Sequence, residues 1–340
     1  MGDAPWVEKY RPIKLCDTIG NQGIIERLEF FAANGNIPNL LLSGPPGCGK
    51  TTSVWAMAKE MLGQHHKKGI LELNASDDRG IEAVRNKIKD FCQAKTTFPS
   101  KNMTKIVILD EADSMTEAAQ QAMRRIMEEY SDTTRFAFAC NNSEKIIEPL
   151  QSRCGILRFS RISDLEMQKR LLQVCKSENV EHDEKGLMQL VNLAEGDMRQ
   201  ALNNLQCTVA AYQIVTAENV LKVCDEPHPT QIIAILTNAF EQKFEAAVAC
   251  IDHLWTCGYS TTDILSNLSK QIKSIRLPEI IRIEFMREIG IAHARALMGQ
   301  GSKVQLLSLV STLVLKRERL QVEYKGTSCE AELAAMSNKA

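Results

Sequence analysis

Three features are missing from this sequence, and each absence excludes a class of protein. Neither charge is in excess: the 340 residues carry a formal net charge of −1, which excludes a protein that coats nucleic acid through overall positive charge. No CxxC pair occurs among the eleven cysteines, so reduced thiols in an intracellular compartment are favoured over a zinc site or a disulfide framework. No apolar run approaches the roughly 20 residues that cross a bilayer, and the longest, Leu306 to Leu315, is interrupted by polar residues.

Targeting and repeat signals are missing as well. The charged stretch from Met1 to Pro12 lacks the apolar core of a signal peptide. No repeat with a period of roughly 20 to 50 residues and no low-complexity tract is visible, which argues against a solenoid. Apolar residues make up 44% and charged residues 24% of the chain, as in ordinary globular proteins. We expect a soluble intracellular protein of two or three domains, with no membrane contact.

The first part of the chain alternates short strand-like runs with helical patterns. Runs such as KIVILD are apolar without alternation, which is typical of strands buried on both faces of a mainly parallel sheet. The sequence therefore predicts an α/β fold for this part. The strand-like runs lie at residues 39–43, 70–74, 105–110, 135–140 and 156–159.

After Arg161 the strand-like runs stop and helical patterns continue. Pro227 and Pro229 cannot lie within a helix, so we expect a domain boundary there. The sequence predicts an α/β domain over 1–160, a helical domain over 161–226, a second helical domain over 230–325 and a flexible tail over 326–340. In the second helical domain a set of apolar residues recurs at helical spacing, which we interpret as a packing core. These residues are Leu306, Leu309, Val310, Leu313 and Val314.

The strongest chemical signal is GPPGCGKT at 44–51, which matches the phosphate-loop pattern G-x-x-x-x-G-K-[ST]. It follows the apolar run LLLS and precedes a helical pattern, as the motif requires. Glycines let the backbone curl so that successive amides point at phosphate oxygens. We expect Lys50 to neutralise the β- and γ-phosphates and the Thr51 hydroxyl to ligate Mg²⁺.

Two carboxylates end an apolar strand about sixty residues later, in IVILDEAD at 106–113. We expect Asp110 to hold Mg²⁺ through water and Glu111 to orient or deprotonate the attacking water. Together with the phosphate loop, this pair indicates ATP binding with Mg²⁺ and its hydrolysis. The letters DEAD also occur in RNA helicases, but those carry two tandem α/β domains, whereas this sequence shows one.

Further motifs point to a family. WVEKYRP opens the chain at 6–12, LELNASDDRG lies at 71–80, SRC at 152–154 and GDMR at 196–199. With GPPGCGKT and LDEAD they closely resemble the small subunits of replication factor C, the eukaryotic clamp loader among the AAA+ ATPases. The resemblance runs from Trp6 to about Tyr324. The stretches KVCDEPHP and LWTCGYSTTDI look most like the class of small subunit numbered 2 in animals and 4 in budding yeast.

The resemblance implies roles for individual residues. Asn141 matches the sensor that hydrogen-bonds the attacking water or the γ-phosphate, and only the family pattern separates it from its neighbour Asn142. Arg199 matches a second sensor that reaches the γ-phosphate from the lid. Arg153 matches the arginine finger that acts in trans, in the site of a neighbouring subunit, which we expect to be the large one. The nucleotide-binding residues implied are Val7, Arg11 and Ile19 around the adenine, and Gly44, Pro45, Pro46, Gly47, Cys48, Gly49, Lys50, Thr51 and Thr52 around the phosphates.

One position departs from the family, since Cys48 stands where threonine is usual. The backbone amide at this position contributes to the phosphate cradle, so we expect nucleotide binding to survive. A thiol there would make the site sensitive to oxidation.

Partners also follow from the resemblance. It implies a heteropentamer with the large subunit and three other small subunits, a ring-shaped sliding clamp (proliferating cell nuclear antigen), primer–template DNA and a nuclear location. The helices over 161–226 would form a lid, and those over 230–325 a collar that holds the subunits together. Two alternatives stay open: another AAA+ remodelling ATPase, such as a branch-migration helicase or a chaperone, and a scaffold subunit whose nucleotide site is occupied but idle.

A basic segment is the candidate for DNA contact. Residues 79–105 carry a net charge of +5, against −6 for the rest of the chain. Ile81, Val84, Ile88 and Phe91 recur at helical spacing and should face the core, which leaves Arg85 and Lys89 outward. An ordinary solvated helix face is the alternative. The family tips the balance toward DNA phosphates for Arg79, Arg85 and Lys89.

Weaker interpretations concern the neighbouring segments. Arg124 and Arg125 would contact DNA, relay its presence to Glu111, or form a plain exposed pair. Their helix should begin at Ser114, with Glu117 at capping-box spacing. Phe91 and Phe98 are candidates for clamp contact, with buried anchors as the equal alternative.

Overall fold

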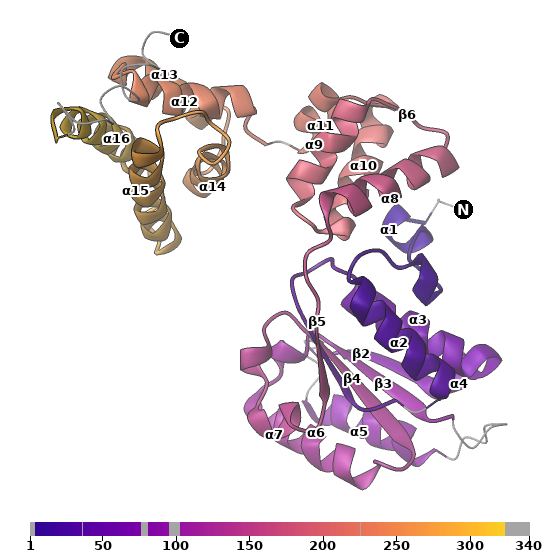
Figure 1. Cartoon of the computed structure of the whole chain (residues 1–340). Helices are drawn as coiled ribbons and strands as arrows, with labels where there is room; N and C mark the ends of the chain where they lie inside the picture. Colours follow the sequence, from indigo (N-terminus) through magenta and orange to yellow (C-terminus); the bar gives the residue numbers. More distant parts are fainter. Residues whose placement is uncertain (1–3, 36, 76–80, 95–102, 225, 324–340) are drawn as a thin grey trace. The chain divides into compact units, whose positions relative to one another are not determined.

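The structure is a computed structural model that describes residues 4–35, 37–75, 81–94, 103–224 and 226–323. The chain forms two compact units, divided between Val223 and Cys224. The first unit contains the sheet and the phosphate-loop motif, and the second contains helices (Figure 1). No helix in the described ranges combines the length and the apolar character needed to cross a membrane.

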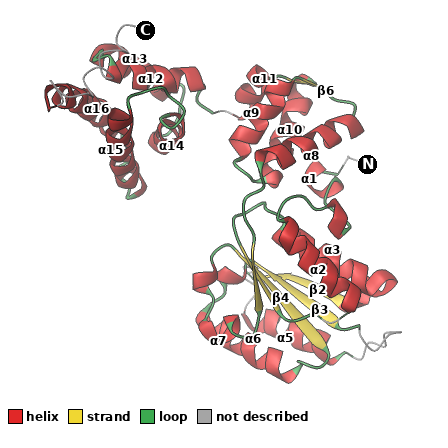
Figure 2. Ribbon diagram, in the orientation of Figure 1, coloured by secondary structure: helices red, strands yellow, loops and turns green. Residues whose placement is uncertain are grey.

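The first unit is built on a five-stranded sheet in which every neighbouring pair is parallel. The strand order is β2-β3-β4-β1-β5. Figure 2 shows the sheet in yellow, with helices on both sides of it. All five predicted strands are confirmed, with shifts of one residue at some ends. Their bounds are β1 Leu40–Ser43, β2 Ile70–Asn74, β3 Lys105–Asp110, β4 Thr134–Cys140 and β5 Gly155–Arg158.

Both faces of the sheet are buried, which explains the unbroken apolar runs. Leu40 and Leu42 pack into one hydrophobic cluster with α2 and α3, while Leu41 packs into the opposite one with α5 and α6. The helices of this layer are α2 Gln22–Asn34, α3 Lys50–Leu62, α4 His66–Gly69, α5 Ile81–Gln93, α6 Glu117–Glu129 and α7 Glu148–Gln151. Single 3₁₀ turns lie at Leu15–Asp17, Gly63–His65, Ala112–Ser114 and Ser143–Lys145.

Parallel pairing brings the carboxyl ends of three strands to one edge. Ser43 at the end of β1 pairs with Cys140 at the end of β4, and Leu109 of β3 pairs with Phe138. The residues that follow these strands are the phosphate loop, Asp110 with Glu111, and Asn141. This edge is where open α/β sheets bind ligands.

Helix α6 begins later than the sequence predicted. Thr116, not Ser114, is its N-cap, and the threonine hydroxyl accepts from the Ala119 amide. Ser114 lies in the preceding 3₁₀ turn, where its hydroxyl donates to the Glu111 carbonyl. Serine and threonine both suit an N-cap. The 3₁₀ turn Ala112–Ser114 occupies the predicted start, so the N-cap of α6 is Thr116 and not Ser114.

A helical region, here called the lid, completes the first unit. It comprises α8 Asp164–Ser177, α9 Glu184–Ala194, α10 Met198–Tyr212 and α11 Ala217–Cys224, and the N-terminal helix α1 Trp6–Lys9 packs on α10. The prediction that strands stop at Arg161 is wrong in one detail, because β6 Glu181–His182 pairs with β7 Ile214–Val215. Strands of two residues are too short to leave a periodic pattern.

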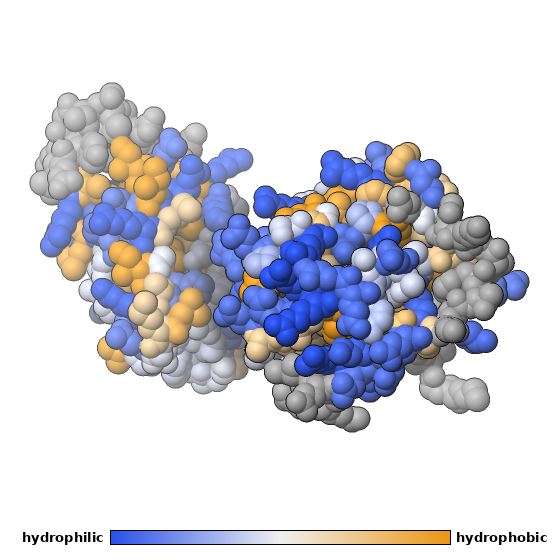
Figure 3. Space-filling view, turned by 90° about the horizontal axis from the view of Figure 1, so that it is seen from below, coloured by the Kyte–Doolittle hydropathy of each residue, from blue (hydrophilic) through white to orange (hydrophobic). Residues whose placement is uncertain are grey.

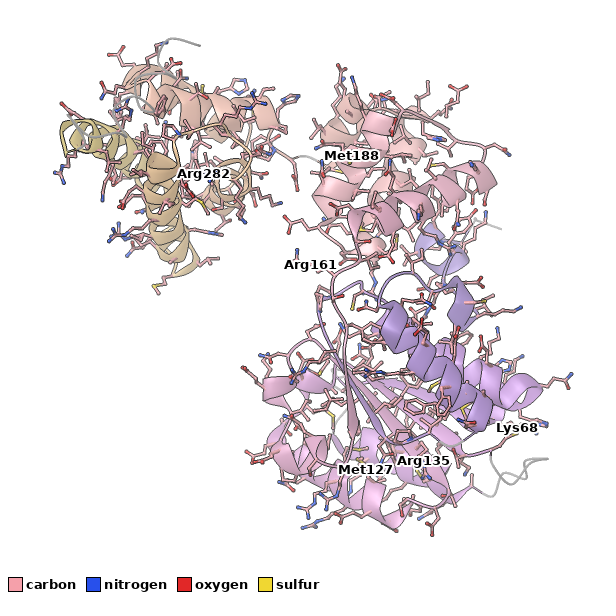
Figure 4. All side chains as sticks on the ribbon, in the orientation of Figure 1. Lys68, Met127, Arg135, Arg161, Met188 and Arg282 are labelled. Atoms are coloured by element: carbon pink, nitrogen blue, oxygen red, sulfur yellow. The ribbon has the colours of Figure 1, made fainter. Side chains whose placement is uncertain are left out.

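Arg161 lies on the connection from the sheet to the lid (Figure 4). Its guanidinium donates to the carbonyl and to the carboxylate of Glu195, at 3.0 and 3.2 Å. The next residue, Ile162, donates its amide to the Gly196 carbonyl. Hydrogen bonds thus join Gly196 of the GDMR motif, and Glu195 before it, to the connection between the sheet and the lid.

The second unit consists of helices around its own apolar core. They are α12 Pro229–Phe240, α13 Phe244–Thr256, α14 Thr261–Gln271, α15 Glu279–Leu297 and α16 Lys303–Glu323. Pro229 occupies the first position of α12, where a missing amide hydrogen costs nothing. The predicted packing stripe is confirmed: Leu306, Leu309, Val310 and Leu313 are buried in the core, and Val314 packs against it.

Candidate nucleotide-binding site

The loop from Gly44 to Gly49 joins β1 to α3 and can be built only with glycine at two positions. Gly44 has a φ of 154°, and a Cβ there would meet the Phe159 carbonyl oxygen at 2.4 Å. Gly47 has a φ of 65°, and its Cβ would meet the Asp197 Oδ1 atom at 1.7 Å. The curled backbone that the sequence predicted is therefore present, and the lid closes against it.

Lys50 lies at the head of this loop, as the first residue of α3. Its side chain is only 8% exposed, and its Nζ donates to the carbonyls of Gly44 and Pro45, both at 2.7 Å, and to Asn141 Oδ1 at 3.0 Å. All three acceptors are neutral, and within the described ranges Lys50 has no ion pair. A buried ammonium without a counter-charge is costly, so the site favours an anion.

Thr51 and Asp110 meet beside Lys50. The Thr51 hydroxyl donates to Asp110 Oδ2 at 2.9 Å, and the Glu111 amide donates to Asp110 Oδ1 at 2.9 Å. Glu111 itself adopts the left-handed conformation, with a φ of 51°, and its side chain is exposed. No group of three His, Cys, Asp or Glu side chains in the described ranges could hold a metal ion. One hydroxyl and one carboxylate fit Mg²⁺, which keeps several waters and binds substrate phosphates.

A cavity of about 360 Å³ lies at this edge of the sheet, a size that suits a small ligand. It brings together residues from the N-terminal segment, the phosphate loop, the strand ends and the lid. Its predicted lining residues are Val7, Arg11, Ile19, Pro46, Gly47, Cys48, Gly49, Lys50, Thr51, Thr52, Asp110, Glu111, Asn141 and Arg199. Gly44 and Pro45 do not line it, but their carbonyls hold Lys50 from behind.

The structure separates Asn141 from its neighbour Asn142, which the residue pattern alone did not. Asn141 lines the cavity and accepts from Lys50. Asn142 caps the following 3₁₀ turn, where its Oδ1 accepts from the Glu144 amide at 2.9 Å. Its side chain is therefore already used for local structure.

Arg199 reaches the cavity from the first turn of α10. Asp197 caps this helix, and its Oδ1 accepts from the amides of Arg199 and Gln200 at 2.8 and 3.1 Å. The Met198 amide donates to the Gly47 carbonyl at 3.3 Å. The helix that carries Arg199 is thus seated on the phosphate loop.

Arg153 lies outside this cavity. Its Nη2 atom is 2.5 Å from Glu128 Oε1 on α6, and its Nη1 donates to the Pro149 carbonyl at 2.8 Å. Arg124 donates to the same Glu128 oxygen at 3.2 Å. The pKa of Glu128 is lowered, first by the hydrogen bond from Arg124 and then by the nearby Arg153 charge. Arg125 is exposed on the same helix.

Cys48 is buried behind the loop, at 1% exposure, and its thiol donates to the Pro45 carbonyl at 3.0 Å. Burial raises the pKa of this thiol. Oxidation requires thiolate and access, and both are reduced here. The expected sensitivity to oxidation therefore has no support in the geometry.

Fewer basic side chains of the segment over 79–105 are exposed than its net charge suggested. Arg85 is exposed and Lys89 half-buried on α5, but Lys105 is buried at 4% exposure. Its Nζ donates to the carbonyls of Phe91, Cys92 and Ala94, and so caps the end of α5. Burial lowers the pKa of Lys105.

Other predictions in this segment divide in the same way. Arg79 and Phe98 lie outside the described residues, as do the tail over 326–340 and the side chains of Ile81 and Val84. Ile88 is buried as predicted, and Phe91 packs against the core, which supports an anchor. Hydrophilic side chains cover much of the face on the α5, α6 and α7 side (Figure 3).

Some cavity residues gave no signal in the sequence. Arg170 on α8 and Leu202 on α10 line the cavity, yet they belong to no motif. The Arg170 guanidinium donates to the Tyr10 carbonyl at 2.8 Å. Burial lowers the pKa of Arg170. Only the fold brings these residues to the site, across sequence separations that no local pattern spans.

Comparison with known proteins places this site in context. The model "ATPase family associated with various cellular activities (AAA)" matches residues 40–162, and the model "Replication factor C C-terminal domain" matches residues 227–312. The replication factor C subunit 2 of Arabidopsis thaliana is 54% identical, over 92% of this chain and 94% of the relative. Subunit 4 of Saccharomyces cerevisiae is 51% identical, over 91% and 95%, respectively.

More distant proteins agree in outline. The replication factor C small subunit of Halobacterium salinarum is 39% identical, over 92% of this chain and 97% of the relative. Among solved structures, the RuvB Holliday junction branch migration motor of Thermotoga maritima superposes with a TM-score of 0.53. It is 18% identical, over 68% of this chain and 80% of that chain, so this likeness shows the fold alone.

Proposed function

Since the chain belongs to the replication factor C small subunits, clamp-loader components of DNA replication in the AAA ATPase family, we propose that it binds and hydrolyses ATP with Mg²⁺ inside a heteropentamer. The pentamer joins it to the large subunit and three other small subunits. ATP binding lets this assembly open the ring-shaped sliding clamp, the proliferating cell nuclear antigen. Hydrolysis releases the clamp around primer–template DNA in the nucleus.

The surroundings of Lys50 are the observation that supports ATP binding. Its ammonium is buried against two carbonyls and one amide oxygen, and it faces a cavity lined by the phosphate loop. The phosphates of ATP supply the negative charge that these neutral acceptors lack. Their oxygens also accept from the loop amides at the start of α3, where the helix dipole favours an anion.

The residues around Lys50 divide the hydrolytic work. Thr51 and Asp110 would hold Mg²⁺, which would neutralise charge on the phosphate oxygens. Glu111 lines the cavity beside Asp110 and orients or deprotonates the attacking water. Asn141 Oδ1 accepts from Lys50, which leaves the amide nitrogen to donate to the water or the γ-phosphate.

Arg153 acts in a neighbouring site. It is bonded to Glu128 and Pro149 and lines no part of this chain's own cavity, so it cannot serve its own nucleotide from this position. In the assembly it stabilises charge on the phosphoryl group held by the adjoining subunit, which we propose is the large one. The active site is then shared between subunits.

DNA contact is proposed for the outward face of α5. Arg85 is exposed there, and Lys89 lies one turn further along. These side chains would contact the phosphates of primer–template DNA without reading its sequence, together with Arg79. Lys105 does not belong to this surface, because its ammonium is committed to the end of α5.

We propose the following division of labour along the chain. Residues 1–160 form the nucleotide domain, 161–226 the lid and 230–325 the collar that holds the pentamer together, with 326–340 as a tail. The nucleotide domain and the lid belong to one compact unit, which suits a cavity that both of them line.

Reconstitution tests the proposal. The chain should co-purify with the other replication factor C subunits, and the complex should hydrolyse ATP faster when DNA and the clamp are added. Lys50→Ala in this chain should remove its share of ATP binding while the complex still assembles. A homohexamer of this chain that hydrolyses ATP by itself would contradict the proposal.

A further inference from the structure

The N-terminal segment Pro5–Tyr10 is bonded to the lid by side chains far away in sequence. The Trp6 amide donates to Gln206 Oε1 on α10 at 2.9 Å. The Lys9 ammonium and the Tyr10 hydroxyl both donate to Glu178 Oε1, at the end of α8, at 2.6 Å. These contacts hold both ends of the short helix α1 on the lid.

Two further contacts strengthen this attachment. Arg170 of α8 donates to the Tyr10 carbonyl at 2.8 Å. The Trp6 indole is buried and meets the Tyr10 ring edge-on, with the ring centroids 6.5 Å apart. The segment is therefore attached to the lid through its backbone at Trp6 and Tyr10 and through the side chains of Lys9 and Tyr10.

Immediately after this segment the chain passes from the lid to the α/β core. The Leu15 amide donates to Glu60 Oε1 on α3 at 2.8 Å, and the Leu15 side chain is fully buried in the α/β core. Arg11 lies at the crossing, with its guanidinium 3.8 Å from Glu72 and 6.0 Å from the Trp55 ring centroid. Of the cavity residues predicted to surround adenine, Val7 lies in α1, which packs on α10 of the lid, and Ile19 lies a few residues after Leu15 of the α/β core.

We infer that Glu178 and Gln206 are positioning residues for adenine binding, because they fix the segment that carries Val7 to the lid. This inference rests on the proposed function, in which the cavity takes ATP. The base then contacts the same rigid body as Arg199, whose helix α10 also carries Gln206. Adenine and the γ-phosphate hold the lid from two ends of one nucleotide.

The phosphates and the base of ATP would be held by different parts of the chain. The phosphates are held by the loop from Gly44 to Thr51, which does not depend on Glu178 or Gln206. The base depends on the segment that these residues hold. Loosening the segment should therefore weaken binding of ATP and leave binding of a ligand without a base unchanged.

The test uses the full chain and measures its affinity by calorimetry for ATP and for inorganic tripolyphosphate, both with Mg²⁺. Gln206→Ala removes the acceptor of the Trp6 amide, and Glu178→Gln removes the charge that strengthens the bonds from Lys9 and Tyr10. Each should weaken ATP binding about threefold to tenfold and leave tripolyphosphate unchanged. Gln206→Glu keeps an acceptor for the Trp6 amide and should bind ATP nearly as the wild type does. Glu181→Gln, on an exposed lid strand, is the matched control.

Three outcomes are distinguishable. Unchanged ATP affinity in both variants would overturn the inference, and so would an equal loss for ATP and tripolyphosphate, which indicates general loosening of the fold. A wild-type chain that binds neither ligand would instead contradict the proposed function. Thermal melting of each variant identifies one that fails to fold, in which case the other variant decides.

Discussion

The Thr51 hydroxyl donates to the Asp110 carboxylate across 2.9 Å and so joins the start of α3 to the end of β3. The two residues lie 59 positions apart in the sequence. Their oxygen atoms are close enough to share one small cation, and the second Asp110 oxygen is fixed by the Glu111 amide. Thr51 and Asp110 therefore lie close enough to hold the proposed Mg²⁺ together.

Asp110→Asn tests this arrangement. The amide keeps an oxygen that can accept from Thr51 or Glu111, so the melting temperature should change little. It removes the negative charge, so the gain in ATP affinity that Mg²⁺ gives the wild type should fall at least tenfold. Calorimetry with Mg²⁺ and with a chelator measures this gain. An unchanged gain would show that the metal is held elsewhere.

Lys50→Met should uncouple stability from binding. The substitution removes a buried ammonium that has only neutral acceptors, so the free energy of unfolding should stay the same or rise by about 1 kcal/mol. ATP binding should be lost, because Lys50 is the only lysine of the described residues that lines the cavity. Denaturant unfolding and calorimetry check the two halves. Lys68→Met, an exposed lysine on α4, is the matched control (Figure 4).

Much of the fold was predictable because its signals are local. Strands buried on both faces leave unbroken apolar runs, and the loop at 44–51 combines glycines with Lys50 in a fixed order. The register of the parallel sheet then gathers the ends of β1, β3 and β4 without further information from the sequence. These parts of the site needed only the strand assignments and the rule for where such sheets bind ligands.

The remainder depends on contacts between distant residues. Lys105 has the positive charge expected of a side chain that contacts DNA. Its position at the start of β3 instead brings its ammonium to the end of α5, where it donates to a backbone carbonyl. Arg170 and Gln206 contact the N-terminal segment across 160 and 200 positions. Both pairs of residues are too far apart in the sequence for a local pattern to include both members. The outward basic surface is therefore smaller than the sequence predicts, and the attachment of the N-terminal segment to the lid leaves no local signal.

Glu178 should give the lid a dependence on pH. Its pKa lies below the ordinary 4.5, first because Lys9 donates to it and then because Tyr10 does. A carboxyl with a lowered pKa stabilises the fold above its ordinary pKa, and the stabilisation is lost as pH falls through the lowered one. The melting temperature of wild type should exceed that of Glu178→Gln by a constant amount between about pH 6 and 8.

Below about pH 4 this difference should shrink, because protonated glutamic acid and glutamine then bond to Lys9 and Tyr10 similarly. Arg170, which contacts the Tyr10 carbonyl, stays charged throughout. Melting curves from pH 3 to 8 check the trend. A difference that grows on acidification would mean that Glu178 is not the group responsible.

Gly47→Ala should separate the lid from the phosphate loop. A Cβ at this position would lie 1.7 Å from Asp197 Oδ1, and the φ of 65° disfavours any other residue. Asp197 would have to move, which breaks the cap of α10 and costs about 1 to 2 kcal/mol in addition to backbone strain. Lowered stability together with weaker ATP binding is expected. Gly63→Ala is the matched control, because its φ is also positive but nothing lies within 4 Å.

Arg153→Ala should lower ATP hydrolysis in the site of the adjoining subunit. The ion pair between Arg153 and Glu128 is partly exposed and screened by solvent, so the guanidinium can leave it for a neighbour's phosphate at little cost. In reconstituted complexes the variant chain should keep its own ATP affinity, while turnover in the adjoining site falls about 10³-fold. Single-turnover hydrolysis, with the other sites disabled by their phosphate-loop lysines, isolates that site. Arg27→Ala, an exposed arginine on α2, should have no effect. Normal turnover in the adjoining site, or loss of ATP binding by the variant chain itself, would show that Arg153 acts in cis or only in structure.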